Sequence, residues 1–98
     1  MRTMMRVTIP VETGNKAIAD GVMGKIIQET MERIKPEAAY FTADHGQRTV
    51  YFFCDIKDSS QMPVLGEPLF IGLNAKIDFQ PVMNLEELKA GLEKVMKR

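Results

Sequence analysis

The side chains of this sequence that could carry out chemistry are few. Among 98 residues there is one histidine, His45, and one cysteine, Cys54. A structural zinc site uses four Cys or His ligands, so we expect no metal, and a single cysteine cannot form a disulfide within the chain. Cys54 ends an apolar run that begins at Val50, which predicts a small buried side chain rather than a reactive thiol. His45 precedes Gly46 and is expected in a solvent-exposed turn.

Arginine, tyrosine and aspartate side chains offer a second kind of chemistry, the binding of a small acid. Arg6 lies within an alternating segment, and its guanidinium suits a planar carboxylate or enolate. Tyr40 and Tyr51 could donate hydrogen bonds to a ligand or serve as interface aromatics. Asp78 could line the same site or form a structural ion pair with Arg6 at a dimer seam. These four are the candidate ligand-binding residues; no catalytic residue is identified, and we expect no cofactor.

The charge balance and hydropathy exclude several classes of protein. Lys plus Arg and Asp plus Glu each total 13, and this zero net charge argues against a nucleic-acid partner. Hydrophobic residues make up 45%, which argues against disorder. No apolar stretch is long enough for a signal peptide or a membrane-spanning helix. We therefore expect a single cytoplasmic domain over 1–98 with no membrane partner.

Hydrophobic periodicity then predicts the elements that must position these residues. Alternation with period two indicates strands over 4–11, 37–43, 48–56 and 75–83. Spacings of three and four indicate one helix from Asn15 as its cap to residue 35. A second helix is expected after Asp58 or Ser59, kinked or broken before Pro68. A last amphipathic helix is expected after Asn84, which would cap it.

The order strand, helix, strand, strand, helix, strand, helix is typical of one fold class. It predicts an α+β, ferredoxin-like βαββαβ domain with an added C-terminal helix. Right-handed crossovers give a four-stranded antiparallel sheet with strand order 4-1-3-2, and the helices cover one face. Strand 48–56 is apolar at nearly every position, so we expect it to be central and covered on both faces.

The strand pattern leaves a second sheet face that is partly polar and partly aromatic; we name it the open face. It comprises Met4, Arg6, Thr8, Tyr40, Thr42, Thr49, Tyr51, Phe53, Asp55, Lys76, Asp78 and Gln80. The opposite set, which includes Phe41, is expected to point toward the helices. Either a second copy covers the open face by two-fold symmetry, or the final helix folds over it and leaves a monomer. We favour the homodimer, because the aromatic side chains need a large partner surface.

Four segments carry a resemblance to a known group of proteins. They are Gly14-Asn15-Lys16-Ala17-Ile18, Lys35-Pro36-Glu37-Ala38-Ala39-Tyr40-Phe41, Glu67-Pro68-Leu69-Phe70 and Phe79-Gln80-Pro81-Val82-Met83. The chain resembles short uncharacterised bacterial proteins of the dimeric α+β barrel superfamily, which includes muconolactone isomerase and cofactor-independent antibiotic-biosynthesis monooxygenases. The resemblance implies a two-fold barrel with a ligand pocket. No catalytic motif of those enzymes can be placed here, so their activities do not transfer.

Two functional hypotheses follow. In the first, a homodimeric barrel binds a small apolar or aromatic acid between its sheets, and whether it also transforms that acid without a cofactor stays open. In the second, the open face belongs to a structural or interaction module that only seals a dimer or docks a partner protein. A cavity of about 300 Å³ or more with convergent polar groups would favour the first hypothesis.

Overall fold

Four strands and four helices follow one another along the chain in the computed structural model, which describes residues 1–97. The elements are β1 (Arg2–Ile9), α1 (Val11–Ala19), α2 (Met23–Ile34), β2 (Ala38–Asp44), β3 (Gln47–Asp55), α3 (Gln61–Leu73), β4 (Lys76–Pro81) and α4 (Leu85–Met96). The class is α+β, as the periodicity predicts.

The strands form one antiparallel sheet with the order β2-β3-β1-β4. This is the predicted order 4-1-3-2 read from the other edge, and it is consistent with a ferredoxin-like fold. A tight turn at His45 and Gly46 joins β2 to β3, and both residues have positive φ, 52° and 76°. Such a turn matches the twist of paired strands, and glycine adopts it without steric cost.

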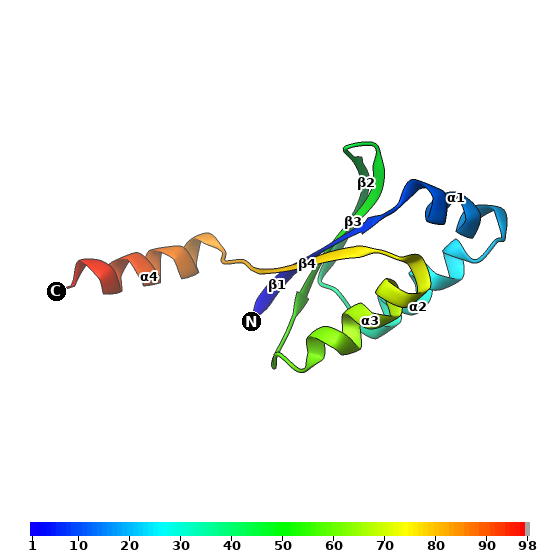
Figure 1. Ribbon diagram of the computed structural model, residues 1–98. Helices are drawn as coiled ribbons and strands as arrows, with labels where there is room; N and C mark the ends of the chain where they lie inside the picture. The colour runs from blue at the N-terminus through cyan, green and yellow to red at the C-terminus, as the bar shows by residue number, and fades with distance from the viewer. Residues whose placement is uncertain (98) are drawn as a thin grey trace.

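Helices α1, α2 and α3 lie on one side of the sheet (Figure 1). Alternate residues of β1 are buried against them, with Met5 and Val7 almost fully enclosed, and Phe52 of β3 joins the same core. Leu69 and Leu73 of α3 pack from the helical side. The expected assignment of strand residues to the helix-covered face and the open face is therefore confirmed by the register of the strands.

The segment expected as one helix from Asn15 is two helices instead. The first begins at Val11, directly after Pro10, so β1 ends at Ile9 rather than at Val11. Proline fits the start of a helix because the first amide groups there need no partner within the helix. Gly21, with φ of 73°, then separates α1 from α2. The left-handed conformation of Gly21 ends α1, and periodicity of apolar residues does not report such a turn.

Helix α3 is also different from the prediction, since it runs through Pro68 without a break. Proline removes one hydrogen bond, to the carbonyl four residues earlier, which here belongs to Val64. The Val64 side chain is exposed, so this turn of the helix faces solvent. Water can therefore hydrate the freed carbonyl, while Leu65 and Leu69 hold the other side of the helix on the core. The start of α3 also lacks the expected side-chain cap, and Asp58 accepts a hydrogen bond from the Ser60 amide instead.

The last helix, α4, begins with the predicted cap. The Asn84 side chain accepts a hydrogen bond from the Glu87 amide, and the Glu87 carboxylate accepts one from the Asn84 amide. The helix does not fold over the open face; it extends away from the rest of the molecule (Figure 1). The open face is therefore not covered by the final helix of its own chain. Its radius of gyration is 16.0 Å, against about 13 Å for a compact domain of similar length.

The helices leave much of the sheet uncovered. Phe41 of β2 points to the helix side as expected, yet 57% of its surface is exposed, because it borders an open pocket that it shares with Met23 and Ile27 of α2. β3 is a central strand, as expected, and its helix side is buried at Val50, Phe52 and Cys54. On the open face Thr49 is buried, whereas Tyr51 and Phe53 are half-buried. No helix formed by residues 1–97 lies on the open face.

Candidate functional site

The four candidate ligand-binding residues lie in a single row across the open face. The strand register places Tyr40 of β2 opposite Tyr51 of β3, Tyr51 opposite Arg6 of β1, and Arg6 opposite Asp78 of β4. Directly opposed residues of antiparallel strands have Cβ atoms about 5 Å apart. One row therefore runs from aromatic side chains at one edge of the sheet to a carboxylate at the other, with Arg6 between them.

The ion pair that Arg6 makes is not the expected one with Asp78. Its Nη2 atom instead donates a hydrogen bond to Oδ2 of Asp44, the last residue of β2. Asp44 is two strands away from Arg6 and four residues along β2 from Tyr40, so the guanidinium reaches diagonally across the open face toward the hairpin turn. Neither side chain is fully buried, so the pair remains reachable from solvent. Asp78 is left exposed beside it without an ion pair among the described residues.

Asp44 is the site residue that sequence reasoning missed. It continues the two-residue alternation of Tyr40 and Thr42, so extending that pattern past the predicted strand end would have placed it on the open face. The neighbouring His45 is exposed in the hairpin turn, as expected, and its Nδ1 atom lies 2.9 Å from Oδ1 of Asp44. Asp44 thus connects the only histidine to Arg6 through its two carboxylate oxygens.

An open cavity of about 600 Å³ surrounds this cluster. Its lining consists of Arg6, Thr8, Asp44, His45, Gln47, Phe70, Ala75, Lys76, Ile77 and Asp78. Arg6 and Lys76 supply positive charge, and Asp44 and Asp78 supply negative charge. Such a lining can bind a small polar or zwitterionic molecule through hydrogen bonds, with the carboxylate of an acid directed to Arg6.

The two tyrosines lie outside this cavity, toward the β2 edge of the same row. Tyr40 is 64% exposed, and its ring meets Phe53 edge to face with the ring centres 6.4 Å apart. This geometry is favourable for aromatic pairs. The open face of one chain thus combines a charged half around Arg6 with an aromatic half around Tyr40. The structure brings Arg6 and Asp78 into one cavity but does not bring the tyrosines into it.

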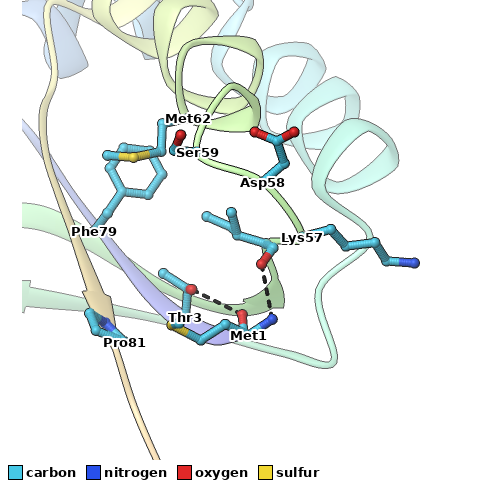
Figure 2. A pocket seen from close by; sticks show the side chains of 9 residues that line it. Met1, Thr3, Lys57, Asp58, Ser59, Met62, Phe79 and Pro81 are labelled. Carbon is cyan, nitrogen blue, oxygen red and sulfur yellow. Dashed lines mark hydrogen bonds between the residues drawn. The ribbon is translucent and has the colours of Figure 1, made fainter.

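A second pocket of about 320 Å³ lies near the start of β1, next to the beginning of α3 (Figure 2). Its walls are mainly apolar, with Met1, Met62, Phe79 and Pro81 among them, and it contains none of the four candidate residues. The Met1 ammonium group donates hydrogen bonds to Asp55 at 2.7 Å and to the Ile56 carbonyl at 2.9 Å.

Other chemistry is not evident in the part of the chain that the structure describes. Cys54 is 2% exposed, as expected, and burial raises the pKa of its thiol. Residues 1–97 contain no group of three or more His, Cys, Asp or Glu side chains placed to hold a metal ion. Within the same range, every helix is too short or too polar to cross a membrane.

Compared with protein-family models, with curated proteins and with solved structures, this chain matches none. The resemblance to the dimeric α+β barrel superfamily stays a prediction from the sequence.

Proposed function

We propose that this protein is a homodimer whose two sheets face each other and bind a small apolar or aromatic acid between them. The observation that carries the proposal is the row of Tyr40, Tyr51, Arg6 and Asp78 across an uncovered sheet face. An aromatic ring of the ligand would lie against the tyrosines, and its carboxylate would reach Arg6. The row thus offers matching groups to both halves of such a molecule.

The state of Arg6 supports an anion-binding role. A guanidinium carries five N–H donors, and one of them is used by Asp44. The buried Nε atom has no hydrogen-bond acceptor. A ligand carboxylate can therefore bind beside Asp44 or exchange with it, because both are planar acceptors of similar size. Arg6 would then be paired with Asp44 in the free protein and with the ligand carboxylate in the bound protein.

The need for a second copy follows from what one chain leaves exposed. Tyr40 presents most of its surface to solvent, and the cavity around Arg6 is open. A large ligand-binding face is normally enclosed, because burial of most of the ligand surface supplies much of the affinity. A second sheet packed by two-fold symmetry would provide the missing wall and double the row.

Thermal shift measurements with a panel of aliphatic and aromatic carboxylic acids test this proposal. We expect at least one acid to raise the melting temperature of the wild-type protein, because a ligand that binds only the folded state stabilises it. Arg6→Ala should lose most of that shift, and Arg6→Lys should keep part of it. Gln80→Ala is the matched control, since Gln80 lies on the open face of β4 outside the cavity lining.

Two results would contradict the acid-binding proposal. One is that no acid stabilises the wild-type protein, and the other is that Arg6→Ala responds as strongly as wild type. Either result, together with a dimer in solution, would favour the interaction module, in which the open face only seals the dimer. The exposed apolar residues of α4 would fit that second function as well.

A further inference from the structure

Asp78 carries a charge that a simple acid ligand would leave unused. The strand register places Asp78 directly opposite Arg6, yet the guanidinium of Arg6 pairs with Asp44 instead. Lys76 lies two residues along β4 from Asp78, and no ion pair joins these two exposed side chains among the described residues. A carboxylate has two acceptor oxygens and no donor, so Asp78 offers a binding position for a cation.

The charges that line the cavity around Arg6 are balanced before any ligand binds. Arg6 and Lys76 carry positive charge, and Asp44 and Asp78 carry negative charge. Asp44 is engaged by Arg6 and lies 2.9 Å from Nδ1 of His45, so the negative charge that remains for a ligand is that of Asp78. A simple carboxylate would add negative charge to this cavity, whereas a zwitterion would add no net charge.

Asp78 works against a simple carboxylate bound at Arg6. Directly opposed residues of antiparallel strands have Cβ atoms about 5 Å apart, which is less than the Debye length of about 8 Å at physiological ionic strength. Two carboxylates at such a separation repel each other, and this repulsion weakens binding. A ligand with an ammonium group next to its carboxylate would be attracted to Asp78 instead.

We propose that the ligand is an apolar or aromatic α-amino acid, with its carboxylate on Arg6 and its ammonium group on Asp78. The side chain, carboxylate and ammonium group of an amino acid branch from one carbon atom. The row across the open face offers Tyr51, Arg6 and Asp78 as adjacent partners for these three groups. This inference rests on the proposed function and adds the second charged group of the ligand.

Calorimetric titration with matched pairs of ligands tests the contact with Asp78. L-phenylalanine is compared with 3-phenylpropanoate, and L-leucine is compared with 4-methylpentanoate. The members of each pair differ only in the ammonium group. We expect the wild-type protein to bind each amino acid about tenfold more tightly than its partner at pH 7, because one charge-assisted hydrogen bond is gained and one repulsion is avoided.

Two substitutions separate the contact with Asp78 from a general effect of charge. Asp78→Asn keeps the shape of the side chain and removes its charge, and it should abolish the preference for the amino acid in both pairs. Glu32→Gln removes one negative charge from the exposed side of α2, outside the cavity lining, and the preference should remain. Both positions are exposed, so neither substitution disturbs the core.

The possible failures of this inference and of the proposed function can be told apart. If 3-phenylpropanoate binds as tightly as L-phenylalanine, or if Asp78→Asn retains the preference, the inference is overturned and the acid-binding proposal stands. If none of the four ligands binds, the inference is overturned as well. The proposed function then depends on the panel of acids, and it is overturned only if no acid of that panel stabilises the wild-type protein.

Discussion

Arg6 lies in the predicted ligand-binding row, but it forms its ion pair with Asp44, which the sequence did not predict. A cross-strand neighbour such as Asp78 can be inferred from strand order, because register fixes which residues oppose each other. The actual partner, Asp44, lies two strands away, and a long flexible side chain reaches it. An ion pair between side chains two strands apart depends on sheet curvature and on side-chain rotamers. The alternation of apolar and polar residues predicts neither of them. The sequence therefore locates Arg6 on the right face but does not identify its ion pair.

Cys54 provides a prediction at the same scale. Because burial raises the pKa of its thiol, little reactive thiolate forms in the folded protein near neutral pH. We expect Ellman's reagent to label less than a tenth of the protein within minutes under native conditions at pH 8. In denaturant, labelling should reach one thiol per chain at once. Rapid stoichiometric labelling of the native protein would show that Cys54 is accessible and would contradict its place in the core.

At the scale of the elements, the end of α2 carries a local strain that a substitution can relieve. Lys35 closes the helix with φ of 49°, a left-handed conformation that disfavours any side chain with a Cβ. We expect Lys35→Gly to stabilise the fold by about 0.5–1 kcal/mol, since the left-handed penalty exceeds the added freedom of the unfolded chain.

Chemical denaturation of matched variants checks this expectation. Gln28→Gly places the same residue in the exposed middle of α2, and it should cost about 1 kcal/mol. The two substitutions should therefore shift the denaturation midpoint in opposite directions. A lower midpoint for Lys35→Gly would mean that contacts of the lysine side chain outweigh the backbone strain.

Element by element, the strands could be predicted more fully than the helices. Period-two alternation predicts four strands and their faces, because burial on one side of a sheet imposes that pattern. The right-handed crossover rule predicts the order of the strands, which the structure confirms. The separation of α1 from α2 at Gly21 could not be predicted, and neither could the continuation of α3 through Pro68. Both depend on how the backbone is hydrated and packed. The exposure of Phe41 was missed for a related reason: alternation shows which way a side chain points, not whether a helix covers it.

At the scale of the whole molecule, the chain is an elongated body with two kinds of uncovered surface. One is the open face with its row of candidate ligand-binding residues, and the other is the apolar side of α4, whose leucines are exposed. A chain with no net charge offers little long-range repulsion to a second copy. The proposed homodimer would cover the open face, so ligand binding and dimer formation can be tested together.

Native mass spectrometry with small carboxylic acids tests that account most directly, since it reports assembly and ligand together. The account predicts a species of twice the 11.1 kDa chain mass that retains an acid from the panel. It also predicts that Arg6→Ala keeps the dimer mass and loses the acid. A wild-type protein of single chain mass at micromolar concentration, or a dimer that retains no acid, would contradict the central claim.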